Sequence, residues 1–256
     1  GWFNGASSYP YIAWQWKANG GTTSSNTDGN ITSTVQANTD AGFSIVTYTG
    51  NFTATQTVGH GLGIRPDMVI IKNRDTAVDW VVWTKDLTSG NFLKLNDTNA
   101  QSSSSRIYQN GFTTSTFGIG ANNAVNKSGD DFIAYCFNSV QGYSKFGKYV
   151  GNSNDNGAFV YLGFKPRWLM IKSTQAGMSW DIIDTARSTS NVMDDYLTVN
   201  TSDPEGTSST KNIDFLSNGF KCRDDNNINF SDHTYIYMAF AENPFVTSTG
   251  VPVPAR

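Results

Sequence analysis

Short stretches of alternating apolar and polar residues run along the chain, and this pattern predicts β-strands. Residues 44–49 alternate between apolar and hydroxyl side chains and end at the turn signal Gly50-Asn51. Residues 68–71 form a continuous apolar run after Pro66, which is typical of a strand that is buried on both faces. No segment sustains the 3.6-residue apolar period of an amphipathic helix. Further strands are predicted at residues 79–84, 92–95, 112–117 and 131–137.

The chain repeats itself after about 100 residues, and this repeat is its most informative feature. Residues 62–72 (LGIRPDMVIIK) recur as residues 162–172 (LGFKPRWLMIK), and Trp80 falls on Trp180 at the same offset. Because each copy holds about seven short strands, we predict two tandem β-sandwich repeats, jelly-roll-like in character, of about 100 residues. Other matching blocks, in the same order, are 48–51 with 149–152, 110–112 with 218–220, 125–126 with 228–229, and 132–137 with 235–240.

The repeat sets the expected domain boundaries. Residues 11–16 have the pattern of the last block of each copy, so residues 1–20 are interpreted as the end of a preceding, truncated repeat. The chain also lacks an initiator Met, and we therefore expect it to be a piece of a longer protein. The remaining boundaries are a Gly-, Ser-, Thr- and Asn-rich linker at 21–41, repeat one at 42–141, repeat two at 142–245, and a C-terminal tail at 246–256.

Composition excludes several classes of partner. Charged residues make up only 15% of the chain and the net charge is -3, so no basic excess exists to hold a phosphate backbone and no nucleic-acid partner is expected. No apolar run approaches the roughly 18 residues that span a bilayer, so no membrane insertion is expected. Aromatic residues reach 13%, and hydroxyl and amide side chains are abundant. Sugar-binding surfaces use these groups, and so do repetitive β scaffolds.

Catalytic and metal-binding signals are weak. The two His and two Cys, namely His60, His233, Cys136 and Cys222, show no zinc-type spacing, so no metal site is predicted. The phosphate-loop motif and the dinucleotide-binding fingerprint are absent from the sequence, and no cofactor is predicted. Neither His has an orienting partner for a nucleophilic triad, and no catalytic residue is assigned.

Positions at which the two repeats differ are the best candidates for ligand contacts, because shared positions serve the fold. In the first repeat they are His60, Trp83 and Tyr108, and in the second they are Trp168, Asp184 and Arg187. Four of these residues have a structural alternative. His60 fits a loop residue between two glycines, Trp168 takes a strand position occupied by Met68 in repeat one, and Asp184 with Arg187 fits a salt bridge across a turn.

The repeated blocks resemble a known family. Residues 11–17, 62–72, 142–147 and 237–245 are similar to repeats of tail-fibre and other virion-surface proteins of marine bacteriophages, and the resemblance covers nearly the whole chain. It implies tandem β domains on the surface of a phage particle, used in host attachment. It also implies other virion proteins as partners, a host surface glycan or receptor as the target, and a homo-oligomer, with a trimer expected from phage fibres in general. It supplies no established catalytic or binding residues.

The expected function is therefore that of a structural virion protein, a tail fibre or surface decoration that binds a host glycan or protein. One alternative is a glycan depolymerase, which needs distant carboxylates such as Asp184 and Asp203 to face each other across a cleft at about 5–10 Å. Another is a purely architectural module that joins subunits through an apolar patch.

Overall fold

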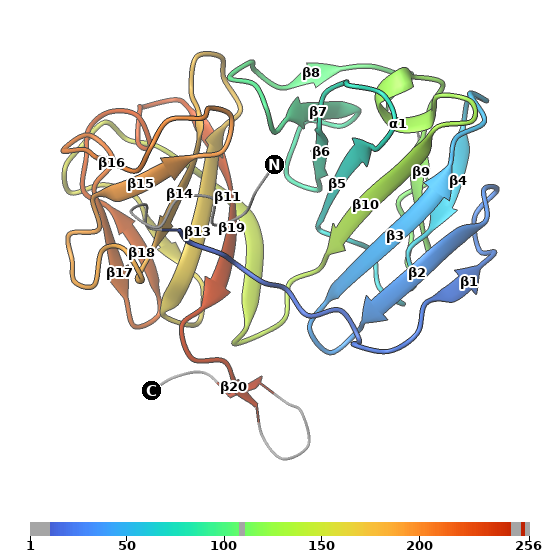
Figure 1. Cartoon of the computed structure of the whole chain (residues 1–256). Helices are drawn as coiled ribbons and strands as arrows, with labels where there is room; N and C mark the ends of the chain where they lie inside the picture. The colour runs from blue at the N-terminus through green and yellow to red at the C-terminus, as the bar shows by residue number, and fades with distance from the viewer. Residues whose placement is uncertain (1–10, 108–110, 247–251, 254–256) are drawn as a thin grey trace.

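The computed structural model describes residues 11–107, 111–246 and 252–253, and its fold is all-β, as predicted. Figure 1 shows two halves side by side, each built on one large antiparallel sheet. No helix in the described ranges has the length and apolar character needed to cross a membrane.

The first half pairs a large sheet with a two-stranded one. The large sheet has the strand order β1-β2-β3-β10-β5-β6-β7-β8, and the small sheet pairs β4 with β9. A single helical turn, α1 (Asn123–Asn126), is capped by Asn122, whose side-chain oxygen accepts a hydrogen bond from the amide of Ala124 at 2.8 Å. The strands are β1 (Ser24–Asn26), β2 (Ser33–Asn38), β3 (Phe43–Thr49), β4 (Gln56–Gly59), β5 (Met68–Asn73), β6 (Val81–Thr84), β7 (Asn91–Lys94), β8 (Ser102–Ser103), β9 (Thr116–Ile119) and β10 (Asp131–Phe137).

The second half has the same plan. Its large sheet has the order β11-β19-β13-β14-β15-β16, and its small sheet has the order β12-β18-β17. The last strand of the large sheet in sequence, β19, lies between β11 and β13, just as β10 lies between β3 and β5. The strands are β11 (Ser144–Val150), β12 (Phe159–Tyr161), β13 (Pro166–Ser173), β14 (Trp180–Asp184), β15 (Asp195–Thr198), β16 (Gly206–Thr207), β17 (Ile213–Leu216), β18 (Gly219–Cys222) and β19 (Thr234–Ala241).

Each half encloses a core between its large and small sheets. In the first half, Val46 and Val69 of the large sheet belong to one buried cluster with Val58 and Phe117 of the small sheet. In the second half, the cluster that contains Leu169 and Ile183 also contains Phe220 of the small sheet. Because alternate residues of a strand point to opposite faces, these clusters use only one face of each large sheet.

A third core fills the space between the two halves. Met68 and Ile70 from the first large sheet share a buried cluster with Met170, Ile182 and Met238 from the second. The central strands β5 and β13 are therefore covered on both faces, which explains the continuous apolar runs in their sequences. Many of the aromatic residues lie in this third core, so much of the aromatic-rich composition reflects packing.

The N-terminal segment, residues 11–18, lies along this third core, and these residues are not part of a strand (Figure 1). Trp16 makes edge-to-face contacts with Trp168 and Phe240, each with ring centroids 5.5 Å apart, and Trp14 contacts Trp168 at 6.2 Å. Ala18 is buried in the same cluster. The origin of this segment in a preceding repeat stays a prediction.

The segment at 21–41 is part of the first half, so its interpretation as a linker is wrong. Strand β1 pairs with β2, and β2 pairs along its length with β3. The polar composition hides the signal, because only alternate positions face the core: Ser33 and Val35 are buried while Thr34 is exposed.

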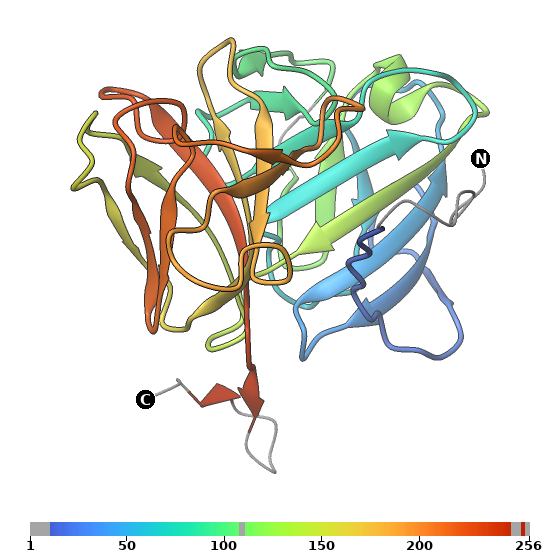
Figure 2. The ribbon, with the colours of Figure 1, turned by 60° about the vertical axis from the view of Figure 1, so that its left-hand side comes forward.

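The expected C-terminal tail contains two short paired strands, β20 (Phe245–Val246) and β21 (Pro252–Val253). Figures 1 and 2 both show this pair extending away from the two halves.

Candidate functional site

His60 lies in the interior of the first half and not at a ligand-accessible surface. Its Nδ1 accepts a hydrogen bond from the amide of Leu62 at 3.1 Å, and its Nε2 is 3.4 Å from the carbonyl oxygen of Thr113. Burial lowers the pKa of His60, which favours the neutral ring. Because the residue has no exposed surface, its role is to hold the loop, and it does not fit the predicted ligand contact.

The three candidates of the second half lie together. Trp168 and Asp184 are opposite each other on β13 and β14, and Arg187 Nε donates to Asp184 Oδ2 at 2.8 Å. Arg187 also donates from Nη2 to the carbonyl of Ile182 at 2.8 Å, and both ends of the ion pair are buried. This buried, hydrogen-bonded ion pair stabilises the turn after β14, which is the structural alternative given for these two residues.

Trp168 lines a pocket of about 320 Å³ between the second large sheet and the N-terminal segment. The ring of Trp168 is buried, and its neighbours in the pocket wall are the aromatic residues Trp14, Trp16, Tyr143 and Phe240. These rings contact one another edge-to-face or tilted, at centroid distances of 5.5–6.2 Å. Trp168 therefore serves mainly the packing of the N-terminal segment.

A larger pocket, of about 930 Å³, opens in the first half around the predicted site residue Trp83. Trp83 lies on β6, and the loops that follow β6 and β8 supply most of the remaining wall. Tyr108, the other candidate in this part of the sequence, lies outside the described residues. The hydroxyl groups of the wall belong to Thr84, Thr88, Ser89 and the run Ser103–Ser104–Ser105.

Trp83 packs against Phe112, a second aromatic residue in the wall of the pocket. Phe112 stacks on Trp83 with ring centroids 3.7 Å apart and planes at 16°. Trp83 is only 7% exposed, whereas Phe112 is half-buried and lines the pocket. An apolar ring beside several hydroxyl groups can pack on the C–H face of a pyranose while the hydroxyls bond its oxygens. The sequence pattern predicts a strand over 112–117, but β9 begins at Thr116, and Phe112 precedes it in a loop.

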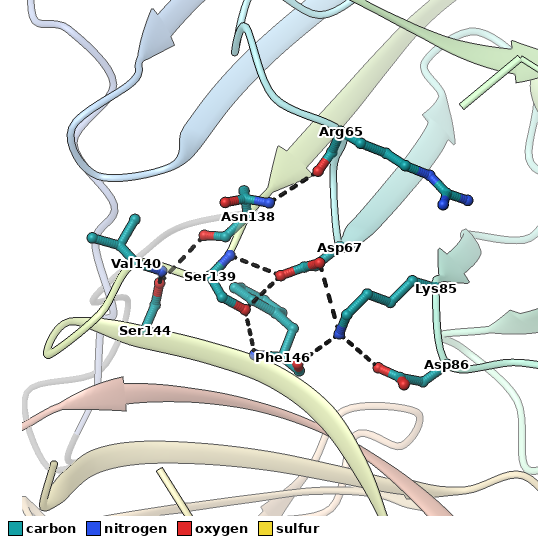
Figure 3. A network of polar contacts seen from close by, with 9 residues as sticks. All are labelled: Arg65, Asp67, Lys85, Asp86, Asn138, Ser139, Val140, Ser144 and Phe146. Atoms are coloured by element: carbon teal, nitrogen blue, oxygen red, sulfur yellow. Dashed lines mark hydrogen bonds and ion pairs between the residues drawn. The ribbon is translucent and has the colours of Figure 1, made fainter. Parts of the chain in front are cut away.

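Polar contacts fix one wall of this pocket to the connection between the halves (Figure 3). Asp67 accepts a hydrogen bond from the amide of Ser139 at 2.9 Å and lies 3.7 Å from Lys85 Nζ. Lys85 also donates to Asp86 and to the carbonyl of Phe146, each at 2.9 Å. Ser139 lies in the connection between β10 and β11, and Phe146 lies in β11. The network therefore joins the pocket wall to the junction between the two halves.

Carboxylates do not face each other in either pocket. Among the described residues, the wall of the larger pocket contains no carboxylate, and that of the smaller one contains only Asp184, which is paired with Arg187. Asp203, the predicted partner of Asp184 in a depolymerase, is exposed and lines neither pocket. Across the described ranges, no group of three or more His, Cys, Asp or Glu side chains is placed to hold a metal ion.

Sequence reasoning found Trp83 but missed its neighbours Arg65, Lys85, Arg106 and Phe112. A usable signal existed, because the second repeat carries Lys165, Ile183 and Thr185 where the first has Arg65, Trp83 and Lys85. A second usable signal was the run of four serines, residues 102–105, directly before Arg106.

The fold and the pocket define an all-β protein of two packed β-sandwich halves, with an open, hydroxyl-rich pocket in the first. Residues 3–244 match the family described as a domain of unknown function, DUF7483, and the chain belongs to this family. No curated protein and no solved structure matches the chain.

Proposed function

We propose that the chain is a structural module of a bacteriophage particle that attaches to a host-surface glycan through the pocket at Trp83 and Phe112. The pocket carries the binding part of this proposal, because it combines a supported aromatic ring with hydroxyl groups in an open cavity of about 930 Å³. The location on a virion rests on the resemblance of the repeated blocks to virion-surface proteins.

The stacked pair gives the pocket a preorganised centre. The ring of Trp83 stacks on Phe112 with the two centroids 3.7 Å apart, and this contact restricts the orientation of Phe112. A ring that is fixed before binding loses little conformational freedom when a sugar stacks on it. A single pocket of this kind is expected to bind weakly, and several copies on one particle gain avidity.

Binding is tested on an array of bacterial polysaccharides and lipopolysaccharides. The variant Phe112→Leu keeps the apolar volume but removes the ring, and it should weaken retention roughly three- to tenfold. Phe159→Leu is the matched control, since Phe159 is an exposed phenylalanine on β12 in the other half. Failure of the wild-type chain to bind any glycan on the array would refute the glycan-binding part.

The location is tested separately. Antibodies raised against the purified chain should label the surface of the phage particles that carry it, seen by immunogold electron microscopy. Particles that remain unlabelled while the antibody recognises the same chain in the lysate would refute the virion assignment.

A further inference from the structure

We infer that the pocket at Trp83 and Phe112 selects acidic saccharides, which bear carboxylate, phosphate or sulfate groups, over neutral ones. This inference rests on the proposed function and adds the chemical class of the ligand. It starts from the charged residues of the wall: the described lining residues include Arg65, Lys85 and Arg106 but no Asp or Glu. The chain as a whole carries a net charge of -3, so this local excess of positive charge is opposite in sign to the net charge of the chain.

Arg65 is the best placed of the three cations. Its backbone is fixed, because Asn138 Nδ2 donates to its carbonyl oxygen at 2.9 Å. Its guanidinium lies over the ring of Trp83, 5.5 Å from the centroid, and Figure 3 shows the side chain extending away from Asp67. Within the described ranges it has no carboxylate partner. The cation–π contact orients the guanidinium and leaves its hydrogen-bond donors for a ligand.

Arg106 supplies a second guanidinium to the wall of the pocket. It is exposed, and it has no ion-pair partner in the part of the chain that the structure describes. Its amide donates to Ser104 Oγ at 3.2 Å, and Ile107 accepts from the amide of Gly120 at 3.1 Å, so the loop around it is anchored. Guanidinium groups match carboxylate and phosphate oxygens with two parallel hydrogen bonds.

Lys85 has a different role. Its charge is offset by Asp86 at 2.9 Å and Asp67 at 3.7 Å, and its remaining contact is a backbone carbonyl. It therefore braces the wall and contributes little net charge to the pocket. The positive charge offered to a ligand therefore comes from Arg65 and Arg106.

The test compares charged and uncharged forms of the same sugar. Binding to alginate, polygalacturonate and phosphate-bearing lipopolysaccharide is measured beside carboxyl-reduced alginate, methyl-esterified polygalacturonate and dephosphorylated lipopolysaccharide. The acidic form of a bound probe should be preferred at least about tenfold at low ionic strength, and the preference should shrink as salt screens the charges. Arg65→Gln and Arg106→Gln should each reduce binding of the acidic form about tenfold.

The controls separate this inference from the proposed function. Arg74→Gln removes an exposed arginine outside the pocket and should leave binding unchanged. Arg65→Lys keeps the charge but loses the planar fork, so it should bind at an intermediate level. Thermal unfolding of each variant shows whether it is folded. Equal binding of neutral and acidic forms, or an Arg65→Gln variant that behaves like Arg74→Gln, would overturn the inference while leaving a Phe112-dependent glycan site intact. If no glycan binds, both fail.

Discussion

Tyr48 donates a hydrogen bond from its hydroxyl to the main-chain carbonyl of Val125 at 2.7 Å, joining β3 to the residues of α1. In the second half, Tyr149 donates in the same way to the carbonyl of Ile228 at 2.6 Å. Both bonds are buried, so each satisfies a carbonyl that water does not reach. Positions paired by the sequence comparison thus make equivalent long-range contacts in the two halves.

Removing either hydroxyl should destabilise the protein measurably. Tyr48→Phe keeps the ring but leaves the carbonyl of Val125 without this donor, at a cost of about 1–3 kcal/mol in the free energy of unfolding. Tyr149→Phe should cost no more than that, because Cys222 Sγ lies 3.9 Å from the same carbonyl of Ile228 and remains as a weak donor. Urea unfolding followed by tryptophan fluorescence gives both values.

The double variant is the control for independence. The two sites lie in separate cores, so the costs should add to within about 0.5 kcal/mol. A coupling clearly larger than this would contradict the separation of the two cores.

The strand pattern could be predicted where side chains alternate or where both faces are covered. The alternation at 44–49 corresponds to β3, and the apolar run at 68–71 lies in β5. Strands β1 and β2 were missed, because both serines of β1 are exposed and because in β2 a serine faces the core while the neighbouring threonine faces solvent. The fold class follows from local patterns, but the packing of the two large sheets against each other does not, since it depends on which faces meet.

The candidate site could be predicted only in part, because its residues come from separate loops. Trp83 was found by its difference from Ile183, but its partner Phe112 reaches it from 29 positions later in the chain. Trp168 and Arg187 also differ between the repeats, and the structure uses both for packing and ion pairing. A difference between copies therefore marks divergence, and only the surroundings show whether a ligand site results.

The carboxylate of Asp67 should matter more for stability than that of Asp86, although both approach Lys85. Asp67→Ala leaves the partly buried amide of Ser139 without its acceptor, with an expected cost of about 1–3 kcal/mol. Asp86→Ala removes only the ion pair with Lys85, whose side chain is more exposed than either carboxylate, so the expected cost is below about 1 kcal/mol. Thermal and urea unfolding of the two variants, measured side by side, test this order. Equal costs would show that the network in Figure 3 does not anchor the junction.

Both cysteines should be unreactive in the folded protein. Cys136 and Cys222 are free and buried, and burial raises the pKa of both thiols, that of Cys222 to about 12. Because the thiolate is the reactive form, an aromatic disulfide reagent at pH 8 should label neither residue until the protein unfolds. A Ser89→Cys variant, with a thiol at an exposed position, should react within minutes under the same conditions. Rapid labelling of the wild-type protein would mean that its cores open readily.

Lys172 gives a pH dependence that a matched variant can isolate. Its side chain is fully buried, and its Nζ donates to the carbonyls of Ser173 at 2.6 Å and Asn99 at 3.3 Å. Burial lowers the pKa of Lys172 from 10.5 to about 8. Between these two values the unfolded chain holds a proton that the folded chain has released. The contribution of Lys172 to the free energy of unfolding therefore rises as the pH increases through this window.

The expected observable is the difference between the wild-type protein and Lys172→Met. Other groups act in the opposite direction, since burial also raises the pKa of Cys136, Cys222 and several tyrosines, and their unfolded forms ionise first at alkaline pH. They are present in both proteins and cancel. The free energy of unfolding of the wild type minus that of the variant should therefore increase between pH 7.5 and 9.5. The same comparison with Lys72→Met, at the aligned position of the first half, keeps Lys172 and should not reproduce this increase. A difference for Lys172→Met that stays flat over this range would show that the buried amine is still protonated at pH 9.5.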